Sequence, residues 1–119
     1  MYVGIVDDDP SVARALSRLL DVNGIESRTY GSARAFLESL DSERPGCLVL
    51  DALMPGMTGL ELQEELARVD AVIPTIMLTA DFDDATRAEA LRGGAVTFLR
   101  KPCDPHILVA AIKAALARE

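Results

Sequence analysis

Short apolar runs recur along the chain at regular intervals, and each run is typical of a buried β-strand. Four runs are clear, at residues 2–7, 47–51, 75–80 and 96–101, and a more polar run lies at 26–30. Between and after them, apolar residues repeat every three or four positions, as in amphipathic helices. Strands that alternate with helices in this way predict an α/β fold with a parallel sheet covered on both faces.

Capping residues support the predicted helices. Asp9 and Ser32 are suited to begin the first and second helices, and Asn23 and Gly93 to end the first and fourth. The apolar stripes predicted for the five helices are Val12, Leu16, Leu19 and Leu20; Ala33, Phe36, Leu37 and Leu40; Leu62, Leu66 and Val69; Ala85, Ala88 and Leu91; and Leu108, Ala111, Ile112, Ala115 and Leu116.

The polarity of the strands predicts their order in the sheet. The runs at 2–7, 47–51 and 75–80 are almost continuously apolar, as interior strands are. The run at 26–30 is polar and the last run ends in charged residues, so these two belong at the edges. A single doubly wound five-stranded parallel sheet in the order 2-1-3-4-5, the flavodoxin-like (βα)5 architecture, satisfies both conditions. In that order the ends of strands 1 and 3 form the crevice where such folds bind ligands.

Polar side chains lie at the carboxyl ends of four predicted strands. Asp7 and Asp8 end the first, Asp51 the third, Thr79 the fourth and Lys101 the fifth. Because the ends of parallel strands meet at one edge of the sheet, we expect these side chains to converge on the crevice. Ordinary strand-end polar residues are the alternative, but four separate strands would then have to agree by chance.

This set of side chains is suited to phosphoryl transfer. Carboxylates at close range repel one another unless a cation is present. Mg²⁺ suits the site best, with Mn²⁺ as a second candidate, because it combines one or two carboxylates with water and phosphate oxygens. Asp51 can act as the nucleophile that forms an aspartyl phosphate. Lys101 and the Thr79 hydroxyl can bind the remaining oxygens of the phosphoryl group.

The sequence resembles the receiver domain of bacterial two-component response regulators, and the resemblance runs nearly end to end. It rests on the segments VDDDPSV, CLVLDALMPGMTGLEL, TIMLTA and GGAVTFLRKP, taken in their order and spacing. The resemblance implies that Asp51 is the phosphoacceptor and that Asp7 and Asp8 organise Mg²⁺. The backbone carbonyl of Leu53 would complete the protein ligands of the metal.

The resemblance also implies roles for residues outside the acidic cluster. Thr79 matches the switch hydroxyl, Lys101 the phosphate-binding lysine and Phe98 a rotating aromatic residue that turns inward on activation. Lys101–Pro102 falls where the family usually has a cis peptide bond. The segments SARAFLESL, MPGMTGLELQ and GGAVTFLRKP further resemble the FixJ-like branch, whose members often carry a helix-turn-helix output domain.

The function implied is a phosphorylation-activated switch rather than an enzyme. A histidine kinase, or a small donor such as acetyl phosphate, would phosphorylate Asp51, and the chain would assist its own phosphotransfer and slow dephosphorylation. The face formed by helix 4, strand 5 and helix 5 would then change and control an output, a partner or a phosphorylation-dependent homodimer. We expect residues 1–119 to form one receiver domain, with no output domain in this chain.

Three other functions use similar residues or the same fold. A haloacid-dehalogenase-type phosphohydrolase needs a second Asp two residues after its nucleophile, and Leu53 stands there. A nucleotide- or flavin-binding module would need a glycine-rich phosphate loop, which the sequence lacks. A degenerate receiver used only as a scaffold stays open, although all five site residues are present.

Composition limits the kinds of partner and the cellular compartment that we expect for this protein. The formal net charge is −7 and no basic stripe is present, which argues against direct nucleic-acid binding by this chain. No apolar run approaches the roughly 20 residues that span a membrane. The start of the sequence lacks the features of a signal peptide, and two cysteines do not make a disulfide framework. We therefore expect a cytoplasmic protein.

Several residues near the predicted site receive simpler interpretations. Cys47 opens a buried strand and is expected to pack as a small apolar side chain. Cys103 lies close to the site, where we expect a bystander thiol, and His106 is expected on the surface in the first turn of the last helix. Asp81 adds a negative charge near the crevice. The apolar side chain of Leu53 cannot position a hydrolytic water, so we do not expect fast dephosphorylation.

Overall fold

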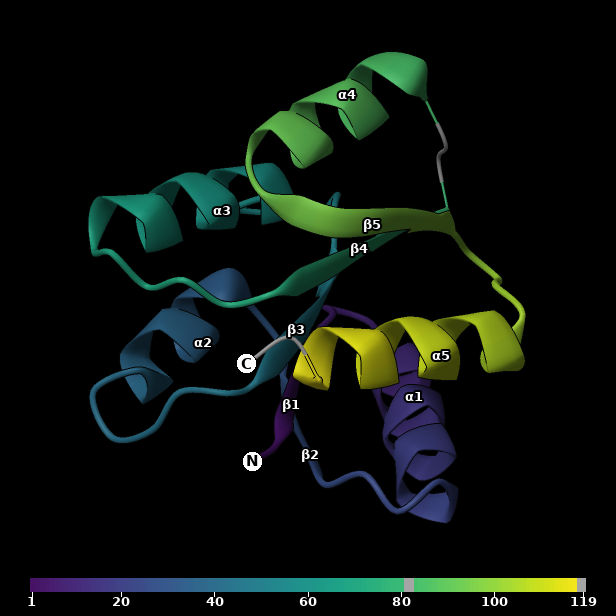
Figure 1. Ribbon diagram of the computed structural model, residues 1–119. Helices are drawn as coiled ribbons and strands as arrows, with labels where there is room; N and C mark the ends of the chain where they lie inside the picture. Colours follow the sequence, from purple (N-terminus) through teal and green to yellow (C-terminus); the bar gives the residue numbers. More distant parts are fainter. Residues whose placement is uncertain (81–82, 118–119) are drawn as a thin grey trace.

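The computed structural model describes residues 1–80 and 83–117. Strands and helices alternate along this part of the chain, as Figure 1 shows. The strands are β1 (Val3–Val6), β2 (Ser27–Tyr30), β3 (Cys47–Asp51), β4 (Thr75–Thr79) and β5 (Ala95–Arg100). The helices are α1 (Pro10–Val22), α2 (Ala33–Ser39), α3 (Gly59–Arg68), α4 (Asp84–Arg92) and α5 (Pro105–Leu116).

The five strands form one parallel sheet in the order β2-β1-β3-β4-β5, which confirms the predicted topology. Every residue of β1, β3 and β4 is buried, whereas β2 at one edge is half exposed. Because β1 and β3 are neighbours whose connections leave in opposite directions, their carboxyl ends border the crevice that the order predicts.

Helices cover the sheet in two layers, with α1 and α5 on one face and α2, α3 and α4 on the other (Figure 1). Each layer encloses its own apolar cluster against the sheet, and burying one large apolar side chain contributes roughly 1.5–3 kcal/mol. The helical residues buried in these clusters include Ala13, Leu20, Leu108 and Ile112 on the first face and Phe36, Leu62, Leu66 and Ala90 on the second.

The predicted helix caps are confirmed. The Asp9 carboxylate accepts hydrogen bonds from the first turn of α1, and the Ser32 hydroxyl accepts one from Ala35 in α2. Asn23 is the C-cap of α1 and Gly93 that of α4. These caps satisfy backbone groups that a helix end leaves without partners, and they therefore fix where each helix begins and ends.

Two of the predicted apolar stripes are wrong in part. Val69 lies just beyond the end of α3 as its C-cap and is exposed. In α4, Ala85 and Leu91 are exposed, and Ala90 is the residue that the helix buries. The reason is that α4 presents only a narrow strip of its surface to the sheet and to α3, so most of its side chains face solvent.

Arg28, in the edge strand β2, contacts one aromatic ring and two carboxylates. Its guanidinium lies 4.1 Å from the centre of the Tyr2 ring, a cation–π arrangement. It also lies 3.3 Å from a carboxylate oxygen of Glu43 and 3.7 Å from one of Glu26. These contacts hold the guanidinium over Tyr2, which directly precedes β1.

Candidate functional site

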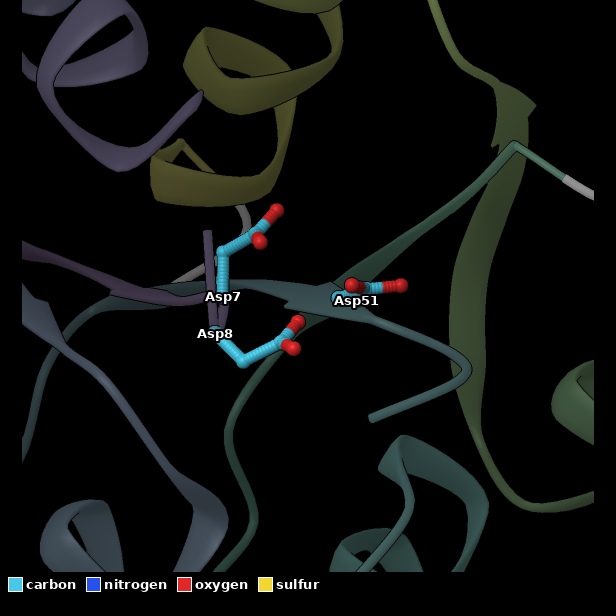
Figure 2. Close-up of side chains that lie close together, drawn as sticks. All are labelled: Asp7, Asp8 and Asp51. Atoms are coloured by element: carbon cyan, nitrogen blue, oxygen red, sulfur yellow. The ribbon is translucent and has the colours of Figure 1, made fainter. Parts of the chain in front are cut away.

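Three carboxylates meet where β1 and β3 end, as the sequence predicted. One oxygen from each of Asp7, Asp8 and Asp51 lies within 4.8 Å of the others (Figure 2). Asp51 is the last residue of β3 and Asp7 follows β1 directly; both are buried, whereas Asp8 is exposed. The crevice therefore has buried acidic walls and one side open to solvent.

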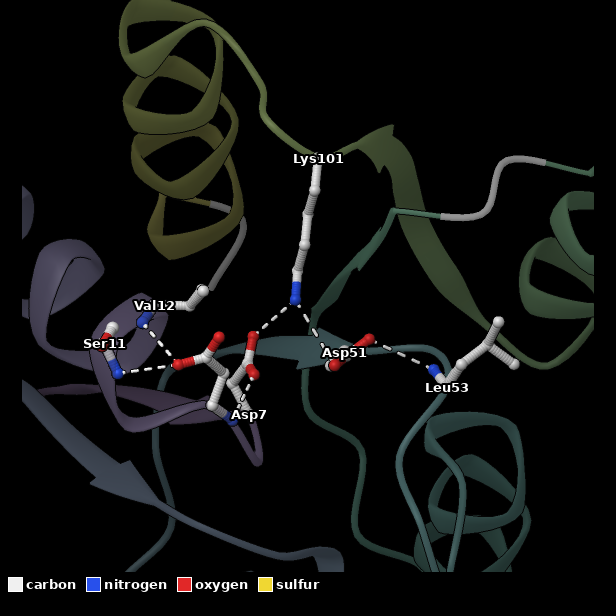
Figure 3. A network of polar contacts seen from close by, with 7 residues as sticks. Asp7, Ser11, Val12, Asp51, Leu53 and Lys101 are labelled. Atoms are coloured by element: carbon white, nitrogen blue, oxygen red, sulfur yellow. Dashed lines mark hydrogen bonds and ion pairs between the residues drawn. The ribbon is translucent and has the colours of Figure 1, made fainter.

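Lys101 reaches into this cluster from the end of β5. Its Nζ donates to Oδ2 of Asp7 at 2.6 Å and lies 3.3 Å from Oδ2 of Asp51 (Figure 3). The backbone N–H of Lys101 donates to the carbonyl of Thr79 at 2.7 Å, which ties the end of β5 to the end of β4. The peptide bond between Lys101 and Pro102 is cis, as the family resemblance implied.

Backbone hydrogen bonds hold the two buried carboxylates in place. Oδ1 of Asp7 accepts from the N–H of Asp9 at 2.9 Å, and the Asp7 N–H donates to the carbonyl of Tyr30 at 3.1 Å. Oδ1 of Asp51 accepts from the N–H of Leu53 at 3.2 Å. The remaining oxygen of each carboxylate faces Lys101, so both side chains are oriented before any ligand binds.

Gly59, the first residue of α3, supports the end of β3 from behind. A Cβ atom at this position would collide with the backbone carbonyl oxygen of Asp51 and would lie 2.9 Å from Cα of Ala52. The Gly59 N–H donates to the carbonyl of Ala52 at 3.0 Å. The sequence analysis missed this residue, although a glycine at the start of a helix that follows a strand end is a recognisable sign of close packing.

Thr58 fixes the start of the same helix through a reciprocal capping box with Glu61. Its hydroxyl accepts from the Glu61 N–H at 3.1 Å, and the Glu61 carboxylate accepts from the Thr58 N–H at 2.9 Å. The position of α3 against Asp51 is therefore set by two local devices, the cap and the absent side chain of Gly59.

Burial and neighbouring charges shift the protonation equilibria of the central pair. Burial raises the pKa of Asp51, and the Leu53 N–H and the charge of Lys101 offset only part of this effect. Burial lowers the pKa of Lys101, but its hydrogen bond to Asp7 and the charge of Asp51 outweigh burial and leave that pKa raised. Lys101 is therefore a firmly charged group beside a carboxylate that gains from a positive neighbour.

Thr79 and Phe98 lie inside the molecule, close to the end of the sheet. Thr79 is the last residue of β4 and is 1% exposed. Phe98, in β5, is 7% exposed and belongs to the apolar cluster that contains Ala90. A buried position for the Phe98 ring is thus already present in this structure, and its inward turn on activation stays a prediction.

The other residues singled out in the sequence lie as follows. Cys47 is fully buried in the core, and His106 is exposed in the first turn of α5, so both interpretations are confirmed. Cys103 is partly exposed and lines a hollow of about 440 Å³ between α1 and α5. Asp81 falls outside the described residues. Leu53 is exposed beside Asp51.

The donor set fits a hard divalent cation. Three carboxylates converge, and burial of Asp51 makes an added positive charge favourable.

Of the helices that the structure describes, none combines the length and the apolar character that crossing a membrane requires.

Comparison with known proteins identifies the family. The family described as "Response regulator receiver domain" matches residues 3–113. The chain is 42% identical to nodulation protein W of Bradyrhizobium diazoefficiens and 39% identical to the transcriptional regulatory protein FixJ of Azorhizobium caulinodans, and each match covers 98% of this chain. These matches cover 52% and 55% of the relatives, so the chain spans about half the length of the curated proteins it matches.

Solved structures agree with this family. The crystal structure of FixJ-N superposes with a TM-score of 0.92 at 37% identity, covering 100% of this chain and 96% of that one. The response regulator StyR gives a TM-score of 0.90 at 43% identity, covering 98% of this chain and 59% of that one. The predicted likeness to the FixJ-like branch is confirmed, and the phosphohydrolase and scaffold alternatives find no support. The chain belongs to the receiver domains of two-component response regulators, a family of phosphorylation-activated switches.

Proposed function

We propose that Asp51 of this chain accepts a phosphoryl group from a histidine kinase and that the modified chain signals through α4, β5 and α5. The observation that carries the proposal is the contact of Lys101 with both buried carboxylates of a three-aspartate cluster. Asp7 and Asp51 both have Lys101 beside one oxygen and a backbone N–H on the other, as a positioned carboxylate requires. Of the two, Asp51 at the end of β3 is the one that the family resemblance assigns as the nucleophile.

The transfer step is a substitution at phosphorus. A carboxylate oxygen of Asp51 bonds to the phosphorus atom, while the bond from phosphorus to the donor imidazole nitrogen breaks and the imidazole keeps the electron pair. Asp7, Asp8, Asp51 and the backbone carbonyl of Leu53 would hold Mg²⁺, or Mn²⁺ in its place. The metal supplies charge neutralisation for the phosphoryl oxygens. Lys101 binds a further oxygen as it leaves Asp7.

The readout begins at Thr79. Its hydroxyl moves toward the phosphoryl group, the Phe98 ring turns further inward into the space that Thr79 leaves, and the face formed by α4, β5 and α5 changes shape. The loss of the phosphoryl group is slow, because the side chain beside Asp51 is the apolar Leu53, which cannot orient an attacking water.

The partners follow from the same function. The phosphodonor is a histidine kinase in the cytoplasm, with small donors such as acetyl phosphate as substitutes. Residues 1–119 act as one receiver domain that controls a fused or separate output, which is DNA-binding if this chain follows the relatives named as transcriptional regulators. The changed face of α4, β5 and α5 can also pair with a second phosphorylated copy. The chain assists its own phosphorylation and does not turn over a substrate.

Intact mass spectrometry tests the acceptor. The wild type should gain one hydroxylamine-labile phosphoryl group from acetyl phosphate with Mg²⁺ and none with a chelator. Asp51→Asn should gain none, while Asp41→Asn, at an exposed position far from the cluster in sequence, should behave as the wild type. A phosphoryl group that persists in Asp51→Asn at the wild-type level would show that another residue is the acceptor.

Thr79→Ala tests the readout separately. This variant should accept the phosphoryl group, since the nucleophile and its metal ligands are intact. The chemical-shift changes that phosphorylation produces in α4 and β5 should be lost or much reduced. Wild-type changes in this variant would contradict the role of Thr79.

A further inference from the structure

Helix α4 is attached to the rest of the molecule mainly at its C-terminal end. Of the residues in α4, Ala90 in the last turn is the one that is buried. Only two residues connect the end of α4 to the start of β5, whereas four separate the end of β4 from the start of α4. At the start of the helix Asp84 and Ala85 are exposed, and Thr86 and Ala88 are half-buried. The two ends of α4 therefore differ in how firmly they are held.

Gln63 on α3 makes the side-chain contact that holds this end. It is 7% exposed, and its Nε2 donates to the backbone carbonyl of Ala90 at 3.1 Å. Its Oε1 lies 2.7 Å from the position that a Cβ atom on Gly93 would occupy. The carboxamide thus lies flat against the last turn of α4, in space that the absent side chain of Gly93 leaves open.

The hydrogen bond completes a helix end that would otherwise lack a partner. In a continuing helix, the Ala90 carbonyl would accept from the N–H of Gly94. Here the Gly94 N–H donates to Leu91 at 3.1 Å, and the Gly93 N–H donates to Glu89 at 2.9 Å. Gln63 supplies the missing donor from a neighbouring helix, in a buried setting where a carbonyl without a partner is costly.

We propose that Gln63 is the positioning residue that makes the C-terminal end of α4 a fixed pivot, so that the switch moves the N-terminal end of the helix. The proposal rests on the proposed function, because it assigns a direction to the change that begins at Thr79. That residue lies at the end of β4, which leads toward the end of α4 opposite to the one that Gln63 contacts. The hydrogen bond and the close approach of Gln63 are both made to the end of α4, so we expect it to act through that helix.

Hydrogen exchange of the wild type, with and without beryllofluoride and Mg²⁺ as the phosphoryl mimic, tests the pivot. Backbone amides of residues 84–88 should change their exchange rates on addition of the mimic, and those of residues 91–94 should stay within about twofold. An equal response at both ends of α4 would overturn the pivot while leaving the proposed function intact. No response anywhere in the chain would contradict the proposed function and the pivot together.

Variants test the assignment to Gln63. Gln63→Met keeps the length of the side chain and removes the donor, so residues 91–94 should exchange about fivefold faster and become responsive to the mimic. Gly93→Ala should act similarly by displacing the carboxamide, because its backbone φ of −78° accepts alanine. Glu64→Gln, on the exposed face of α3, is the matched control and should leave both halves of α4 unchanged. If Gln63→Met leaves residues 91–94 protected and unresponsive, Gln63 is not the pivot.

Discussion

The ammonium of Lys101 lies closer to Asp7, at 2.6 Å, than to Asp51, at 3.3 Å. Asp7 is thus both a proposed metal ligand and the present partner of the lysine. A divalent cation that binds Asp7 competes with this ion pair, and a phosphoryl group on Asp51 offers the lysine a new anionic partner. Cation binding and the movement of Lys101 are therefore coupled through one carboxylate.

Removing the charge of Lys101 should strengthen cation binding and weaken phosphorylation. In Lys101→Met the stem remains, but Asp7 loses its positive neighbour, so the dissociation constant for Mg²⁺ should fall about tenfold. Phosphorylation by acetyl phosphate should slow about 100-fold, because a group that stabilises the transferring phosphoryl oxygens is lost. Calorimetric titration and intact mass measure the two effects. Lys113→Met, exposed on α5, serves as the control, and unchanged Mg²⁺ affinity in Lys101→Met would show that the lysine does not compete for Asp7.

Asp51→Asn should stabilise the metal-free chain at neutral pH. Because burial raises the pKa of Asp51, the folded chain holds this proton more tightly than the unfolded chain. The stabilisation from the neutral acid is complete below the ordinary pKa of 3.8 and is lost as pH rises through the raised value. Chemical unfolding in the presence of a chelator should give Asp51→Asn a higher free energy of unfolding than the wild type at pH 7. The difference between the two should become small toward pH 3. A variant less stable than the wild type at pH 7 would contradict this sign.

Gly59→Ala should disturb the site through the backbone. The added methyl group collides with the carbonyl of Asp51, so α3 or the end of β3 must shift, at a cost of about 1–3 kcal/mol in unfolding free energy. Phosphorylation should slow as well, since the nucleophile is displaced. Gly31→Ala is the matched control, because no atom lies within 4 Å of its added Cβ. Equal stability of the two variants would mean that the contact at Gly59 relaxes freely.

The two thiols should differ sharply toward alkylating reagents. Burial raises the pKa of Cys47 to about 12, so at pH 8 only about one thiol in ten thousand is ionised. Burial also raises the pKa of Cys103, but this side chain is partly exposed. Iodoacetamide should therefore label Cys103 in the native chain and leave Cys47 unmodified until denaturant is added. Labelling of both residues at one rate in the native state would show that the core opens easily.

The sequence was informative about the sheet because the site residues lie at strand ends. Strand polarity alone separated interior from edge strands, and the strand order then brought Asp7, Asp51 and Lys101 together. The predicted strand boundaries agree with the structure to within about one residue. Strand β5 ends at Arg100 rather than Lys101, because Lys101 turns into the crevice while its N–H still bonds to Thr79.

Contacts between a side chain and a backbone group were beyond prediction. From its residue type, Gln63 would be expected to face solvent among the polar positions of α3. Its partner is the backbone carbonyl of Ala90, and every residue has such a group, so the sequence does not mark it. Gly59 did leave a sign in the sequence, a glycine at the start of a helix, but its partner, the backbone carbonyl of Asp51, did not. Leu91 was wrongly predicted to face the core. The spacing of apolar residues alone cannot decide which narrow face of an alanine-rich helix is covered.

The charged residue Arg28 in β2 also affects how copies of the chain meet. An edge strand presents unpaired N–H and C=O groups that can template another strand, and such templating leads to aggregation. Here the edge strand carries a charged side chain, Arg28, whose guanidinium lies over Tyr2 and close to Glu26 and Glu43. A strand added at β2 would lie next to this charge and would have to remove part of its water, so the charged residue disfavours sheet extension between molecules.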